Sequence, residues 1–122
     1  MNITIRTRHL ELTPEMHDQV HDRIAAALDR LATSIHAVDV TITDINGPRG
    51  GLDKHCRIRV RGPSLRTVVI EHLGADTIAV TSVAAERAEQ AVIRGMARGG
   101  RRRLGSVLGL LASLSRRGRV TR

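Results

Sequence analysis

The stretch DTIAVTSVAAERAEQAVIRGMARGGRRR, residues 76–103, decides how the chain can fold, because it predicts one long amphipathic helix. At about 100° per residue, one side of this helix collects arginines and the other side collects small apolar residues. The arginine stripe consists of Arg87, Arg94, Arg98 and Arg101, and the apolar stripe of Ile78, Ala85, Ala88, Val92 and Met96. Val80 and Val83 fall on the arginine side of the first two turns. Gly99-Gly100 is predicted to end the helix.

The sequence before this helix predicts a second helix and four strands. Thr13 suits the N-cap of a helix and Pro14 its first position. The apolar residues of this helix follow at steps of four, four, four and three: Met16, Val20, Ile24, Leu28 and Leu31. Alternating patterns predict strands at residues 2–8, 36–45, 54–61 and 65–73. The fold class is therefore α+β, in the order β-α-β-β-β-α, with a four-stranded, mainly antiparallel sheet and both helices packed on one face.

Length and charge limit the possible domain organisation and the class of binding partner. With 122 residues, we expect one domain, residues 1–100, followed by a basic, amphipathic and flexible tail, residues 101–122. The chain has no Phe, Tyr or Trp, so its core must be aliphatic and bases cannot stack on aromatic rings. Residues 1–93 hold eleven Lys/Arg and twelve Asp/Glu (−1), whereas residues 94–122 hold nine Arg and no acid (+9). This distribution favours nucleic acid or an anionic membrane surface as partner.

The tail segment Leu104–Leu114 leaves three interpretations open: a disordered tail, an anchor to a partner or membrane surface, or a helix for self-association. It is too short to span a bilayer, and we do not expect a membrane to be the main partner. The single cysteine, Cys56, excludes an intramolecular disulfide. The first residues do not read as a secretory signal, so we expect a cytoplasmic protein.

Four stretches resemble the ribosome hibernation-promoting factor family, which includes ribosome-associated inhibitor A. They are MNITI at 1–5, LTPE at 12–15, NGPRGGLDK at 46–54, and residues 76–92. The resemblance covers about residues 1–98. It implies a β-α-β-β-β-α domain that binds the small ribosomal subunit across the messenger channel and the transfer-RNA anticodon sites. By occupying these sites, such a domain would block initiation and preserve idle ribosomes.

The resemblance also implies that basic residues on the two helices contact ribosomal RNA. Carried over by position, these are Arg23 and Arg30 on the first helix and Arg87, Arg94 and Arg98 on the second. The acid-free run adds Arg101, Arg102 and Arg103, and the loop after the second strand adds Arg49 and Lys54. Gln90 stands where relatives are commonly basic, and Ile78 where they are often aromatic. The dimerisation domain of long family members is absent from this sequence, so we do not expect it to pair ribosomes directly.

Simpler interpretations stand beside these predictions. The arginine stripe could be a solvated helix face. The strand arginines Arg57, Arg59 and Arg61 form either a second phosphate-binding surface or cross-strand charge pairs with residues such as Asp39.

Two histidines one helical turn apart, His17 and His21, could chelate a metal, but no third ligand lies nearby in sequence. We therefore expect no metal and no cofactor. No serine has a base nearby in the sequence and no spaced pair of carboxylates stands out, so we also expect no small-molecule substrate and no catalysis. The rival functions are a general RNA- or DNA-binding module, and a membrane-surface or protein-interaction module acting through the tail.

Overall fold

The computed structural model describes residues 1–46, 53–63 and 65–112, and describes residues 97–112 by their backbone alone. The elements are β1 (Asn2–Arg8), α1 (Pro14–Leu28), a 3-10 helix η1 (Asp29–Ser34), β2 (Ala37–Asp44), β3 (Lys54–Gly62), β4 (Leu65–Gly74) and α2 (Thr77–Ala112). This order confirms the β-α-β-β-β-α topology predicted from the sequence.

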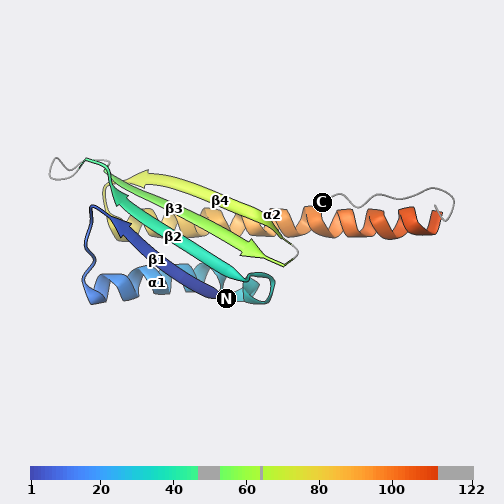
Figure 1. Ribbon diagram of the computed structural model, residues 1–122, viewed down its shortest axis with the longest axis horizontal. Coiled ribbons are helices and arrows are strands. Elements are labelled where there is room, and N and C mark those ends of the chain that lie inside the picture. Colours follow the sequence, from blue (N-terminus) through green and yellow to red (C-terminus); the bar gives the residue numbers. More distant parts are fainter. Residues whose placement is uncertain (47–52, 64, 113–122) are drawn as a thin grey trace.

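The four strands form one sheet in the order β1-β2-β3-β4. The β1–β2 pair is parallel, because α1 and η1 carry the chain back to the starting end of the sheet. The β2–β3 and β3–β4 pairs are antiparallel. The sheet is thus mixed but mainly antiparallel. Both helices lie on the same face of it, α1 beneath β1 and α2 along β3 and β4 (Figure 1), so the opposite face is left without a covering layer.

An aliphatic core fills the space between the sheet and the helices. The fully buried side chains include Val38, Val40 and Ile42 of β2, Cys56, Ile58 and Val60 of β3, Val20, Ile24 and Leu28 of α1, and Ala84, Ala88 and Val92 of α2. The alanines let the α2 backbone approach the strands closely. Because the chain has no Phe, Tyr or Trp, burial of these aliphatic side chains is the main stabilising contribution.

Side-chain caps fix where both helices begin. The Thr13 hydroxyl accepts a hydrogen bond from the Met16 amide at 3.1 Å, which confirms Thr13 as the N-cap of α1. At the start of α2, the Asp76 carboxylate accepts from the Ala79 amide at 2.8 Å. An acid at this end also favours the helix dipole.

The end of α2 differs from the prediction. Gly99-Gly100 does not stop the helix, which continues to Ala112. A glycine ends a helix only where its backbone turns left-handed; one that stays helical costs about 1 kcal/mol relative to Ala. At about 1.5 Å per residue, the 36 residues of α2 span roughly 54 Å. Its last turns therefore project well beyond the sheet (Figure 1). Within the described residues, no helix has the length and apolar content needed to cross a membrane.

Candidate nucleic-acid interface

The arginine stripe of α2 begins with Arg87, on the flank of the helix that faces the edge strand β4. Arg87 Nη1 lies 3.2 Å from Nδ1 of His72 on β4. Arg87 and Arg94 are both exposed, and neither forms an ion pair within the described part of the chain. We call Arg87, Arg94, Arg98 and Arg101 the α2 ridge. The side chains of its last two members, and those of Arg102 and Arg103, lie outside the described residues.

The buried side of α2 is rotated slightly from the predicted apolar stripe. Val80, which falls on the arginine side in sequence, is only 2% exposed, because it packs against Gly74 at the end of β4. Met96, predicted to face the core, is 36% exposed. The first turns of α2 therefore pack against the edge of the sheet, and by Met96 the sheet no longer buries the helix. This rotation places Arg87 of the α2 ridge beside β4 rather than opposite the sheet.

The first helix offers less positive charge than the family resemblance implies. Arg23 is exposed, but α1 also exposes Glu15, Asp18 and Asp22, so one arginine stands against three acids and the net charge is −2. Arg30 lies in η1, because α1 ends at Leu28.

Glu89 of α2 holds the Arg30 side chain. Its Oε2 accepts from Arg30 Nε at 2.9 Å and lies 2.8 Å from Nη2. The Arg30 side chain stays 71% exposed, so solvent and ligands can still reach it. This pair ties the end of the first helical segment to α2.

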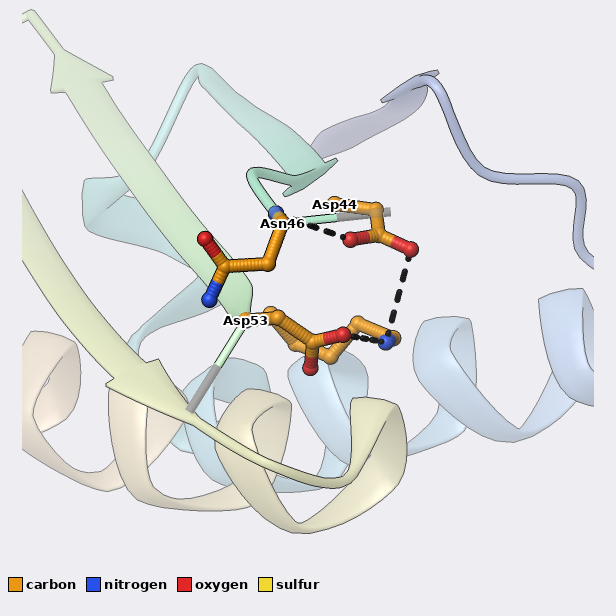
Figure 2. Close-up of polar contacts among 4 residues, drawn as sticks. Asp44, Asn46 and Asp53 are labelled. Carbon is orange, nitrogen blue, oxygen red and sulfur yellow. Dashed lines mark hydrogen bonds and ion pairs between the residues drawn. The ribbon is translucent and has the colours of Figure 1, made fainter. Parts of the chain in front are cut away.

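A charged cluster closes the base of the loop between β2 and β3 (Figure 2). Lys54 Nζ lies 2.9 Å from Oδ2 of Asp53 and 3.6 Å from Oδ2 of Asp44. The Asp53 side chain is 1% exposed, and its hydrogen bond to Lys54 is the main cause that raises the pKa of the lysine. Asn46 adds a backbone hydrogen bond to Asp44 Oδ1 at 3.2 Å.

These contacts favour a structural role for Lys54, because two carboxylates already hold its ammonium group. The RNA contact expected of this residue stays a prediction. Arg49 lies outside the described residues.

On the open face of the sheet, one of the three arginines of β3 forms the cross-strand ion pair that was one of the two alternatives. Arg61 Nη2 lies 3.3 Å from Oδ2 of Asp39 on the neighbouring strand. Cross-strand charge pairing is therefore confirmed for Arg61. No ion pair with Arg57 or Arg59 is present among the described residues.

Groups that could support metal binding or nucleophilic catalysis are sparse. His17 and His21 are exposed on α1, and no three His, Cys, Asp or Glu side chains gather as a metal site within residues 1–46, 53–63 and 65–96. Cys56 is fully buried, and this burial raises the pKa of its thiol to about 11, against a weaker opposing hydrogen bond with Thr81. A thiol of that pKa carries almost no thiolate at neutral pH.

Comparison with known proteins identifies the family. Residues 3–98 match the family described as Sigma 54 modulation protein / S30EA ribosomal protein. Because this match spans most of the chain, the protein belongs to that family, which confirms the resemblance to hibernation-promoting factors.

Two solved structures share the fold. A ribosomal subunit interface protein from Coxiella burnetii aligns with a TM-score of 0.68 at 12% identity, covering 80% of this chain and 99% of its own. The Protein Y N-terminal domain of Thermus thermophilus aligns with a TM-score of 0.63 at 25% identity, covering 77% of this chain and 98% of its own. No curated protein sequence matches the chain.

Proposed function

We propose that this protein is a non-enzymatic, ribosome-associated translation inhibitor that acts in the cytoplasm. It binds ribosomal RNA of the small subunit at the messenger channel and the transfer-RNA anticodon sites. Occupying these sites blocks initiation and preserves idle ribosomes. Family membership over residues 3–98 is the observation that carries the proposal, because this segment includes all of the sheet except its first residue, together with α1 and the packed part of α2.

The α2 ridge is the contact surface that the charge distribution favours. Arg87 and Arg94 are exposed and free of ion pairs within the described residues, and no acid follows Glu89 in the sequence. Guanidinium groups bind phosphate oxygens through two parallel hydrogen bonds. Affinity that comes from phosphate neutralisation should fall steeply as salt rises.

A triple variant tests this surface. Arg87→Ala/Arg94→Ala/Arg98→Ala removes three charges from the α2 ridge, and Arg116→Ala/Arg117→Ala/Arg119→Ala removes the same charge near the C-terminus. We expect the dissociation constant for the small subunit to rise at least a hundredfold in the first variant at 0.1 M salt, since each phosphate contact contributes roughly fivefold to eightfold there. The matched control should change it much less.

Two results would contradict the proposal. If both triple variants lost affinity equally, binding would follow net charge alone and the general nucleic-acid-binding alternative would hold. If neither variant changed the affinity, the α2 ridge would not be the contact surface. Self-association through the tail stays a separate prediction, which sedimentation of the protein without ribosomes would test.

A further inference from the structure

The face of the sheet opposite the helices carries an unusual surplus of arginines. The strand registers place Arg6 and Arg8 of β1 on this face together with Arg57, Arg59 and Arg61 of β3. All five are exposed. We call these five residues the sheet arginine cluster. The described acids that share the face are Asp39 of β2 and Glu71 of β4, so the cluster exceeds them by three charges.

Each acid on the open face is held by one partner, and four of the five arginines in the cluster are left without an ion pair. Asp39 lies opposite Arg59 in the register, but its carboxylate is held by Arg61 at 3.3 Å. Glu71 lies opposite Arg57, but its Oε1 is 2.9 Å from His55 Nε2. Within the described residues, Arg6, Arg8, Arg57 and Arg59 therefore form no ion pair.

The first helix, on the other side of the sheet, has the opposite charge balance. The α1 helix has a net charge of −2, and Arg30 is already paired with Glu89. Four described cations without an ion pair, Arg6, Arg8, Arg57 and Arg59, thus lie together on the face that no helix covers, in addition to those of the α2 ridge. A solvated sheet face with this excess of like charge repels itself across neighbouring strands, which costs stability unless a polyanion neutralises it.

The geometry of the cluster suits a nucleic-acid backbone. Arg6 and Arg57 flank Thr41 in one cross-strand row, so their Cα atoms are separated by about 10 Å, two strand spacings. Arg57 and Arg59 follow each other along β3 at about 7 Å. An array of guanidinium forks at such intervals can bind successive phosphates.

The other features of this face argue against a protein partner. Its exposed large apolar residues among the described ones are Val69 and Leu73, both on the edge strand β4, and they are 42% and 40% exposed. Protein interfaces need a larger apolar or aromatic centre. The face also lacks Phe, Tyr and Trp, so phosphate contacts are expected to contribute more than base stacking.

We propose that the open face of the sheet is a second RNA-binding surface, on which the sheet arginine cluster holds a ribosomal RNA segment distinct from the one at the α2 ridge. The domain then sits between two RNA segments. This inference rests on the proposed function, because the RNA is taken to be that of the small subunit.

Directed hydroxyl-radical cleavage tests the two surfaces separately. An iron chelate is attached to Thr41→Cys, at the centre of the open face, or to Gln90→Cys, exposed on α2. The native Cys56 is fully buried and does not compete for the label. Each labelled protein is bound to isolated small subunits. We expect both probes to cut ribosomal RNA, at different nucleotides.

The outcomes separate this inference from the proposed function. RNA cleavage from Gln90→Cys without RNA cleavage from Thr41→Cys would overturn RNA binding by the open face and leave the proposed function intact. The same holds if the Thr41→Cys probe cut only ribosomal protein. No RNA cleavage from either position would overturn both.

A charge variant gives an independent readout. Arg57→Gln/Arg59→Gln should weaken small-subunit binding about 25-fold or more at 0.1 M salt and lower the slope of log K against log salt by roughly 1.4–1.8. Arg116→Gln/Arg119→Gln is the control with equal charge loss. Unchanged affinity in a folded Arg57→Gln/Arg59→Gln protein would refute the proposal, and so would an equal loss in the control.

Discussion

The ion pair between Arg30 and Glu89 allows a sharp test of whether Arg30 contacts RNA. Glu89→Gln removes the acid but keeps the side-chain shape. The pair is short, with Arg30 Nη2 2.8 Å from Glu89 Oε2, yet its side chains are 71% and 22% exposed. Exposed pairs of this kind contribute about 1 kcal/mol or less, so the fold should barely weaken. The released guanidinium is then free to bind a phosphate.

The gain in affinity can be estimated from counterion release. One additional neutralised phosphate steepens the dependence of log K on log salt by roughly 0.7–0.9. If this contribution vanishes near 1 M salt, Glu89→Gln should tighten small-subunit binding roughly fivefold to eightfold at 0.1 M salt. Binding measured across 0.05–0.3 M salt by fluorescence anisotropy gives both the affinity and the slope.

A double-mutant cycle with Arg30→Ala separates a local effect from a change in net charge. In the Arg30→Ala background, Glu89→Gln should no longer tighten binding. If it tightened binding equally there, the effect would come from net charge alone and Arg30 would not be a contact. If Glu89→Gln left the affinity of the Arg30-containing protein unchanged, the pair would be purely structural.

Two further predictions concern stability. Lys54→Met should lower the melting temperature clearly, because it leaves the buried Asp53 carboxylate without its cation. Arg61→Met breaks an exposed ion pair and should lower the melting temperature little. Equal shifts of the two variants in a thermal melt would contradict this prediction. Because the pKa of Cys56 is about 11 in the fold and 9.0 in a free thiol, the unfolded chain loses this proton first as pH rises, so stability falls between about pH 9 and 11. Urea unfolding should show about 1.3 kcal/mol more loss from pH 8 to pH 10 in the wild type than in Cys56→Ala, and equal losses would refute the assigned burial.

Local sequence patterns were enough to predict the fold because each element is specified by its own residues. Thr13-Pro14 marks the start of α1, and the alternation in β3 separates buried Cys56, Ile58 and Val60 from exposed arginines. The end of α2 was predicted wrongly at Gly99-Gly100. Glycine permits a left-handed turn but does not require one, and the residues before and after this pair are compatible with a helix.

The candidate site was less accessible to sequence reasoning, because its charges are balanced by distant residues. Arg30 and Glu89 lie 59 positions apart, so nothing local indicates that they pair. The division of charge along the chain gave −1 for residues 1–93, but this sum conceals an acidic α1 and a basic open sheet face. Only the strand register shows that Arg6 joins Arg57 in one row. The sequence did contain a signal for this surface, because arginines alternate with apolar or small residues in both β1 and β3.

The proposed occupancy of the decoding region is best tested by co-sedimentation with isolated ribosomal subunits across a salt series, with messenger and initiator transfer RNA added as competitors. We expect saturable one-to-one binding to the small subunit that weakens steeply with salt and is displaced by the competing RNAs. If the protein stayed at the top of the gradient even at low salt, it would not be a ribosome-binding factor. If it bound the large subunit equally well, or stayed bound beside both competitors, the proposed occupancy of the decoding region would be wrong.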